Sequence, residues 1–333
     1  MIKILFTGAG FSHNWGAPLG SEMWALIFNQ RAIQDNHHLR DAMMKANNFN
    51  YEDVYVDVLD KCADEEKRIF SAALKQAYSL VDDIVKKPNK NISEKLRVFV
   101  KAFTLKNGSC DDFGCFFTLN QDLLIERICS AELNNYDWER PILYSGLSAF
   151  SSNELLEEIN VKNFDSKAAD NAFNQDGLPY IKLHGSSNWF FDKEKDSLLV
   201  VGNSKSKTEM IDQWPILKWN FEKFEEVLQK PGKKKMLIIG YGFRDLHINK
   251  VISEAKELEL HILSPDEPRK FFENLEGIEN RSDGVMDIQN KIRGYYTYAL
   301  SICDYDTNLH SDHGFKQSNF WLNFQKNFFF KTK

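Results

Sequence analysis

Short apolar runs that end at glycine or at polar residues recur along the chain and predict the strands of a buried sheet. Such uninterrupted runs of about four to eight residues are typical of parallel strands that are covered on both faces. The predicted strands are residues 2–6, 113–119, 180–183, 236–239, 258–263 and 295–302. Each run except the last precedes a turn, so the pattern indicates a layered domain rather than a helical bundle.

Between the strands, apolar residues return every three or four positions, which predicts amphipathic helices. Residues 21–30 form one such helix with Ser21 as its N-cap, and residues 66–85 and 93–105 form two more, the second with Ser93 as its N-cap. No strand pattern interrupts residues 31–108, so we expect a helical insertion there. Strands that alternate with helices predict an α/β fold, a Rossmann-like doubly wound parallel sheet.

Two further segments lack this alternation. Residues 134–177 are rich in Asn, Asp, Ser and Gly and predict a polar insertion, while residues 304–333 form a tail crowded with Phe and Trp between polar residues. We therefore expect one α/β domain over residues 1–303 and an aromatic C-terminal tail that is available for contacts in a homo-oligomer.

Composition narrows the class of protein without naming a function. The 333 residues are 43% hydrophobic and 27% charged, and 42 basic against 48 acidic side chains give a net charge of 42 − 48 = −6. A mildly acidic chain is a poor candidate for a dedicated nucleic-acid binder. The five cysteines contain no C-x-x-C pair, and no apolar run is long enough for a signal peptide or a membrane span. We expect a cytoplasmic protein with no zinc module and no other metal.

Glycine-rich turns follow two of the predicted strands, at Gly8-Ala9-Gly10 and Gly240-Tyr241-Gly242. In doubly wound sheets such turns let the backbone approach a phosphate at the start of the next helix. The dinucleotide fingerprint needs a third glycine, where this chain has His13 in the first turn and Asp245 in the second. Tight turns without a ligand explain either motif equally well.

Polar residues follow two more strands and are candidates for a site. Thr118-Leu119-Asn120-Gln121-Asp122 comes at the end of one strand, and His184 at the end of the next. Ligands of open α/β sheets bind outside these strand ends, and an imidazole there can take up a proton near neutral pH. The structural alternatives are helix capping, favoured for Asp122, and a histidine held by backbone hydrogen bonds.

These motifs in this order, from Gly8-Ala9-Gly10-Phe11-Ser12 and Gly16-Ala17-Pro18 to Gly240-Tyr241-Gly242-Phe243, resemble the sirtuin (silent information regulator) family. The Lys182-Leu183-His184-Gly185-Ser186 segment is similar to the bacterial sirtuin-like NADase branch of antiphage defence systems. The resemblance covers roughly residues 1–20, 113–130 and 180–263, and it leaves the insertions and the tail unexplained.

The resemblance implies that NAD is the substrate and that the sheet edge binds it. The implied cofactor-binding residues are Gly8, Ala9, Gly10, Ser12, Thr118, Gly240 and Gly242, and the implied catalytic residues are Asn120, Asp122 and His184. Deacetylating sirtuins usually have a four-cysteine zinc module, which this sequence cannot supply. The resemblance therefore favours an NAD⁺ hydrolase that releases nicotinamide and ADP-ribose.

Two other functions use the same residues. One is a protein deacylase or ADP-ribosyltransferase, in which a peptide or another acceptor replaces water. The other is a non-catalytic sensor that binds NAD or ADP-ribose and signals to a partner. A hydrolase of NAD would harm its own cell, so the resemblance also implies that it is held inactive by self-association or by a neighbouring-gene partner such as a HerA-like ATPase.

Overall fold

The structure is a computed structural model, and it describes most of the predicted sheet and helices. The described residues are 1–13, 15–46, 49–85, 96, 99–100, 103, 113–129, 143–144, 156–173, 178–191, 197–279 and 287–296. Most of the predicted helix at 93–105 and the whole of the aromatic tail lie outside them. Among the described residues, no helix has the length and apolar character that crossing a membrane requires.

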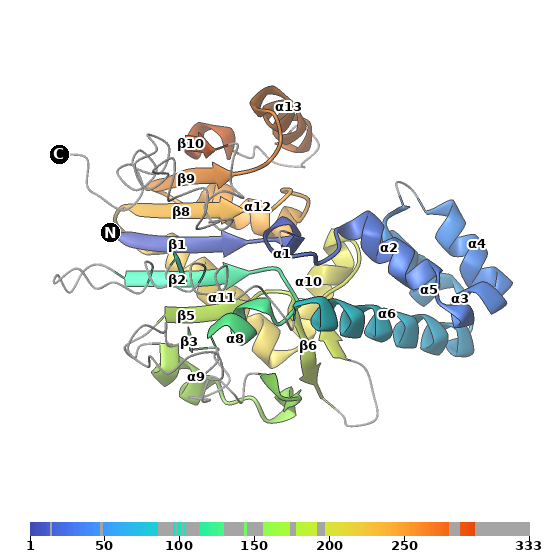
Figure 1. The fold of residues 1–333 in the computed structure, drawn as a ribbon. Coiled ribbons are helices and arrows are strands. Elements are labelled where there is room, and N and C mark those ends of the chain that lie inside the picture. Colours follow the sequence, from blue (N-terminus) through green and yellow to red (C-terminus); the bar gives the residue numbers. More distant parts are fainter. Residues whose placement is uncertain are drawn as a thin grey trace, which may run out of the picture.

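Seven parallel strands form the central sheet, in the order β10-β9-β8-β1-β2-β5-β3 (Figure 1). The strands are β1 (Ile2–Thr7), β2 (Phe113–Thr118), β3 (Leu143–Tyr144), β5 (Leu178–Lys182), β8 (Lys234–Ile239), β9 (Leu258–Leu263) and β10 (Ile292–Tyr296). The chain adds β2 and β5 on one side of β1 and β8 to β10 on the other. This reversal of direction at β1 confirms the predicted doubly wound sheet.

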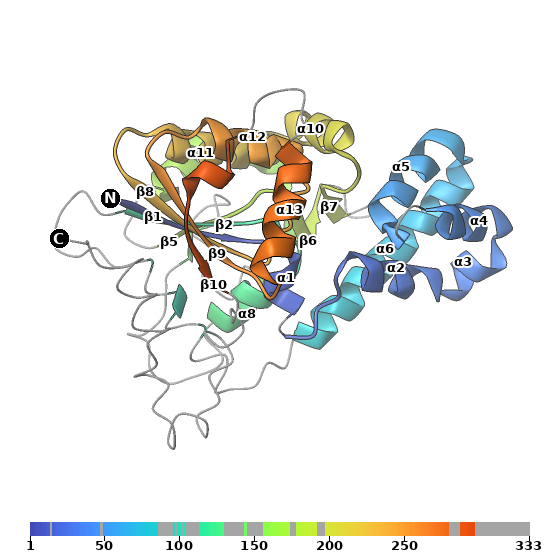
Figure 2. The same ribbon diagram turned by 90° about the horizontal axis from the view of Figure 1, so that it is seen from above.

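Both faces of the sheet are buried, as the uninterrupted apolar runs predict. In β1, Leu5 packs into one core layer, whereas Ile4 and Phe6 pack into the opposite layer. Helices α11 (Pro215–Gln229) and α12 (Leu246–Glu254) cover the face of Ile4 and Phe6, and α8 (Leu124–Cys129) covers the other face (Figure 2). Alternate residues of a strand point to opposite faces, so one strand contributes to both layers.

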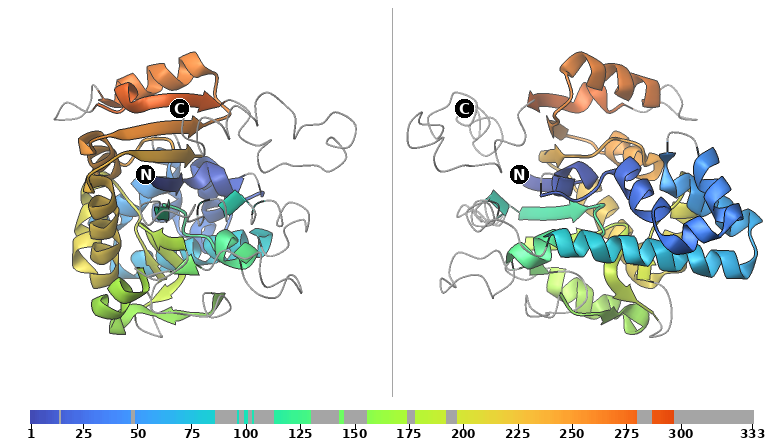
Figure 3. Two further views of the ribbon diagram at one scale, coloured as in Figure 1. Left: turned by 90° about the vertical axis from the view of Figure 1, so that its left-hand side faces the viewer. Right: turned by 45° about the vertical axis from the view of Figure 1, so that its right-hand side comes forward.

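A group of helices lies beyond the carboxyl end of β1, and the long α6 runs from the sheet out into this group (Figure 3). Its members are α1 (Ala9–His13), α2 (Gly20–Phe28), α3 (Arg31–Asp35), α4 (His37–Lys45), α5 (Tyr51–Lys61) and α6 (Asp64–Val85). The predicted N-cap at Ser21 is wrong. Helix α2 begins at Gly20 after Leu19, whose N–H donates to the Glu22 carboxylate over 2.7 Å.

A smaller sheet was not predicted, because two of its strands are very short and β6 opens with Gly-Ser-Ser. Strand β6 (Gly185–Phe190) pairs with β4 (Ile159–Asn160) and, in antiparallel orientation, with β7 (Ser197–Leu199). Three further helices described by the structure are α9 (Ser166–Phe173), α10 (Ser204–Gln213) and α13 (Pro268–Glu279). Strand β6 starts directly after His184, so this small sheet fixes the chain that follows the candidate histidine.

Candidate active site

The two glycine turns meet at the carboxyl edge of the sheet, after the neighbouring strands β1 and β8. The N–H of Gly10 donates to the carbonyl of Gly240 over 3.0 Å. A Cβ on Gly8 would lie 2.7 Å from the Gly240 oxygen, and a Cβ on Gly240 would lie 2.2 Å from the Phe11 nitrogen. The close approach of the two turns therefore requires these glycines, whatever the turns bind.

The first turn does not open a long helix, because α1 ends after five residues at His13. Ser12 lies in α1 and is buried, and its hydroxyl accepts a hydrogen bond from Asn120 Nδ2 over 2.9 Å. The loop of Asn120 is in turn fixed by Thr118, whose hydroxyl accepts from the Asn120 N–H over 3.0 Å. The structure thus brings together the two predicted polar positions that follow β1 and β2.

Asp122 has the capping role that sequence reasoning favoured. Its Oδ1 accepts from the N–H of Leu124 over 3.0 Å, at the start of α8. Beneath it, Lys182 and Glu126 form a buried ion pair with 2.7 Å between Nζ and Oε1, and Lys182 also donates to the Asp122 carbonyl. These contacts give Asp122 and its neighbours a positioning role in the loop that holds Asn120.

His184 follows β5 and lies beside this loop. Its side chain is 4% exposed, and burial holds its pKa well below the usual value. Its Nε2 lies 3.2 Å from Nε2 of His247, the second residue of α12, and burial lowers the pKa of His247 to about 4. Burial therefore disfavours the protonated form of both imidazoles.

An ion-pair chain reaches this histidine pair from the helical group. Lys207 Nζ lies 2.7 Å from Asp245 Oδ1 and 3.0 Å from Glu52 Oε2, which joins α10 and the α12 turn to α5. Burial opposes ionisation of Asp245, but the nearby His184 imidazole and Lys207 ammonium outweigh it and lower the pKa of Asp245 to about 2. Asp245 precedes α12 without capping it, since its side chain makes no cap hydrogen bond.

Gln121 forms a second link from the helical group to His184. Its Nε2 donates to the carbonyls of His184 over 2.9 Å and of Val200 over 3.0 Å, and its Oε1 accepts from the hydroxyl of Tyr78 in α6. The Tyr78 hydroxyl lies 3.1 Å from that of Tyr51 in α5. The backbone at His184 is thus held by side chains from a distant part of the sequence.

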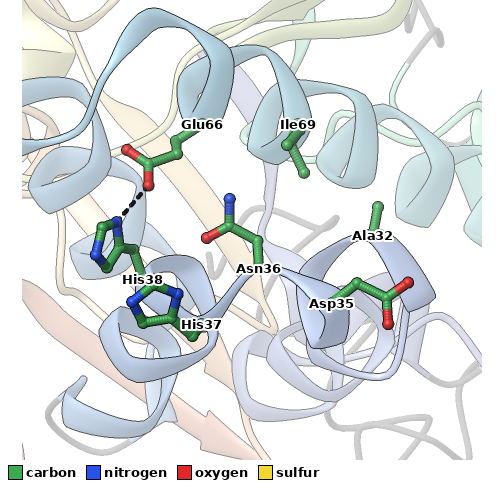
Figure 4. A pocket seen from close by; sticks show the side chains of 7 residues that line it. All are labelled: Ala32, Asp35, Asn36, His37, His38, Glu66 and Ile69. Atoms are coloured by element: carbon green, nitrogen blue, oxygen red, sulfur yellow. Dashed lines mark hydrogen bonds and ion pairs between the residues drawn. The ribbon is translucent and has the colours of Figure 1, made fainter.

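A separate cavity of about 470 Å³ lies within the helical group, away from the sheet edge. Ala32, Asp35, Asn36, His37, His38, Glu66 and Ile69 line it (Figure 4). His38 Nδ1 lies 2.7 Å from the Glu66 carboxylate, which makes an exposed ion pair when the histidine is protonated. None of the predicted site residues borders this cavity.

The structure places most of the predicted site residues at one edge of the sheet. Gly8, Gly10 and Gly240 form the paired turns, and Ser12 and Asn120 are hydrogen-bonded to each other. His184 lies next to them, because the N–H of the preceding residue, Leu183, donates to the Thr118 carbonyl over 2.8 Å. Ala9 and Gly242 are exposed at the same turns.

Sequence reasoning missed His247, which faces His184, and the groups linked to this site through Asp245 and Gln121, namely Lys207, Glu52 and Tyr78. Lys207, Glu52 and Tyr78 come from segments with no recognised motif, and their positions depend on how the helices dock. His247 had a signal in the sequence, because it follows Asp245 at Asp-x-His spacing directly after the second glycine turn.

Comparisons with known proteins find one family model and a similar solved structure. Residues 114–274 match the family model of the SIR2-like domain. A solved structure described as a Sir2 homolog–NAD complex is similar, with 12% sequence identity and a TM-score of 0.42 over 91% of this chain and 86% of that chain. No curated protein matches the sequence.

Proposed function

The chain belongs to the sirtuin family through the SIR2-like domain at residues 114–274, and from this premise we propose that it is an NAD⁺ hydrolase. One observation supports this most directly. The bonded pair of Ser12 and Asn120 and the buried imidazole of His184 lie where the strands β1, β2 and β5 end. This edge is where open α/β sheets bind nucleotides.

In the proposed reaction, the bond between nicotinamide and C1′ of the ribose breaks, and water forms a new bond to C1′. Nicotinamide leaves with the bonding electrons, and the products are nicotinamide, ADP-ribose and one proton. Asn120, a buried amide with both donor and acceptor atoms, positions the water or the nicotinamide amide. His184 orients the ribose or accepts the proton, which a neutral imidazole can do.

The Gly8-Ala9-Gly10 turn and Ser12 hold the phosphates in this proposal, and Gly240 and Gly242 lie near the adenosine half. Thr118 supports this arrangement through its bonds to the loop of Asn120. The near-complete burial of His184 favours an enzyme that is inactive until its site opens. A homo-oligomer or a HerA-like ATPase partner would open it during phage infection, in the cytoplasm.

The proposal predicts that His184→Ala and Asn120→Ala each lower the rate of nicotinamide release at least about 100-fold, because each removes a group that acts in the transition state. Chromatography of nicotinamide and ADP-ribose from NAD⁺, at several protein concentrations, measures this. His38→Ala is the matched control, since this histidine is exposed in the helical group.

Free ADP-ribose would identify water as the acceptor, and nicotinamide release that requires added peptide would instead indicate a deacylase or a transferase. Undiminished release by both variants would contradict the assigned roles. Tight NAD binding by calorimetry without any release, also after addition of the partner ATPase, would show a sensor.

A further inference from the structure

His184, His247 and Asp245 form a cluster of three potential metal ligands that the sequence did not suggest. One ligand atom from each residue lies within 4.8 Å of the other two. The two imidazole Nε2 atoms are 3.2 Å apart. Two nitrogens on a tetrahedral zinc ion, each about 2.0–2.1 Å from the metal, lie about 3.3 Å apart. The spacing of the histidines therefore already matches one edge of a zinc tetrahedron.

The carboxylate of Asp245 is available as the third ligand. Lys207 binds its Oδ1, and within the described residues no hydrogen bond reaches its Oδ2. Asp245 also occupies the N-cap position of α12 without capping that helix, so its side chain is not committed to the backbone there. Asp245 and His247 are less deeply buried than His184, and the Asp245 side chain is 13% exposed.

The charges around the cluster favour a divalent cation. Asp245 and Glu52 are each negative and Lys207 is positive, so the charged side chains here sum to −1 when all three are ionised. Lys207 can remain paired with Asp245 Oδ1 and with Glu52, 3.0 Å away, when a metal ion binds the other oxygen of Asp245. His247 Nδ1 is buried and has no hydrogen-bond partner in the described structure. The imidazole of His247 can therefore adjust toward a metal ion without breaking a hydrogen bond at Nδ1.

We propose that His184, His247 and Asp245 bind one Zn²⁺ ion. Imidazole and carboxylate ligands in a set of three are typical of zinc sites that keep a fourth position for water. The expectation of no metal came from the absence of paired cysteines, and this site uses none. If the proposed function holds, the ion binds the lone pair on Nε2 of His184. The histidine then cannot accept a proton from the water, and the ion inhibits cleavage of NAD⁺.

Zinc binding is measured on the full-length protein by competition with a chromophoric chelator. We expect the wild type to retain one equivalent, and His247→Ala and His247→Gln to bind at least about 100-fold more weakly, since even residues that only support metal ligands change affinity 10–100-fold. His38→Ala, at the other histidine-rich place of the chain, should bind as the wild type does. Circular dichroism and a thermal melt check that the variants fold.

Cobalt substitution identifies the ligand type. Histidine and carboxylate ligands give visible d–d bands without the near-ultraviolet band of a thiolate, so a thiolate band would place the ion on cysteines and overturn the proposal. Failure of the wild type to compete with the chelator, or unchanged affinity in His247→Gln, would overturn it as well.

Activity is a separate readout. We expect added Zn²⁺ to stop nicotinamide release by the wild type and a chelator to restore it. If the wild type binds zinc at these residues but never cleaves NAD⁺, the proposed function fails and the metal site stands.

Discussion

At the residue scale, the site depends on contacts that leave no space for a side chain. Gly240 has a φ of +66°, in the left-handed region, and its α-carbon faces the backbone of Gly10 and Phe11. An L-residue is strained in this conformation, and here its Cβ would also collide with backbone that cannot move aside. The two glycine turns are therefore tied to one another by shape as well as by a hydrogen bond.

We predict that Gly240→Ala lowers the free energy of unfolding by about 2–5 kcal/mol, from backbone strain and collision together. Gly232→Ala is the matched control, because Gly232 also has a positive φ of +97° but faces open space. Strain alone should cost the control about 1–2 kcal/mol. Denaturant unfolding measures both, and equal losses would show that the contact between the turns contributes nothing.

The polar residues at the sheet edge could be predicted from the sequence, but their contacts with the helical group could not. Ser12 and Asn120 meet because parallel strands end at a common edge, and the sequence shows both strands. Asp122 caps α8, because an Asp is favoured where its carboxylate accepts a hydrogen bond from the first N–H groups of a helix. By contrast, the contact between Tyr78 and Gln121 depends on how α6 docks, and no local pattern encodes that docking.

At the element scale, α8 and β5 are joined by an ion pair that is removed from water. The side chains of Lys182 and Glu126 are 3% and 4% exposed, and burial raises the pKa of Glu126 despite the nearby lysine. Burying two charges costs much of what their attraction returns. The pair therefore serves more to fix the loop before α8, through the bond from Lys182 to the Asp122 carbonyl, than to stabilise the fold.

Glu126→Ala should lower the free energy of unfolding by about 3–5 kcal/mol, because it leaves Lys182 as an uncompensated buried charge. The double variant Lys182→Met with Glu126→Leu should recover most of this loss, since well-packed apolar residues can replace such a pair. Chemical denaturation tests both variants. A loss below about 1 kcal/mol in the single variant would show that water reaches the lysine.

The strands and helices with strong periodicity could be predicted, and their limits differ from the structure by a few residues. β9 spans Leu258–Leu263 as expected, and β8 begins two residues before the predicted start. Strand β6 was missed because Gly185, Ser186 and Ser187 are not typical of strands. Its pairing comes from the tertiary fold, which overrides local propensity.

At the scale of the whole molecule, the helical group and the sheet share one site. Glu52 and Tyr78 from the helices contact Lys207 and Gln121 from the α/β part, and both contacts lead to His184. A change in how the helices dock would therefore reach the candidate catalytic histidine. The division into one domain with insertions remains a prediction, as does any role for the tail.

Acid should destabilise the whole fold, because its buried histidines resist protonation. Burial lowers the pKa of His261 in β9 to about 4, from 6.5 in the unfolded chain, and those of His184 and His247 move the same way. The unfolded chain then binds protons first as the pH falls. The stability is complete above pH 6.5 and is lost between 6.5 and about 4, by up to about 3 kcal/mol for His261 alone.

Denaturant unfolding between pH 7 and pH 4, with a chelator present, measures this loss. His261→Gln keeps a polar group but cannot titrate, so its stability should fall less steeply with acid than that of the wild type. Identical slopes for the two proteins would mean that His261 is protonated in the folded state as readily as in the unfolded chain.

The central place of β1 has a consequence for how the protein is made. This strand pairs with β2, which begins at residue 113, and with β8, which begins at residue 234. At a synthesis rate of about 5–20 residues per second, its second neighbour emerges roughly 10 to 50 seconds after β1 itself. During that interval an apolar strand lacks a partner on one side, and such long-range parallel pairing is slow even once the chain is complete. The strand order thus leaves one edge of β1 open to non-native pairing for most of translation.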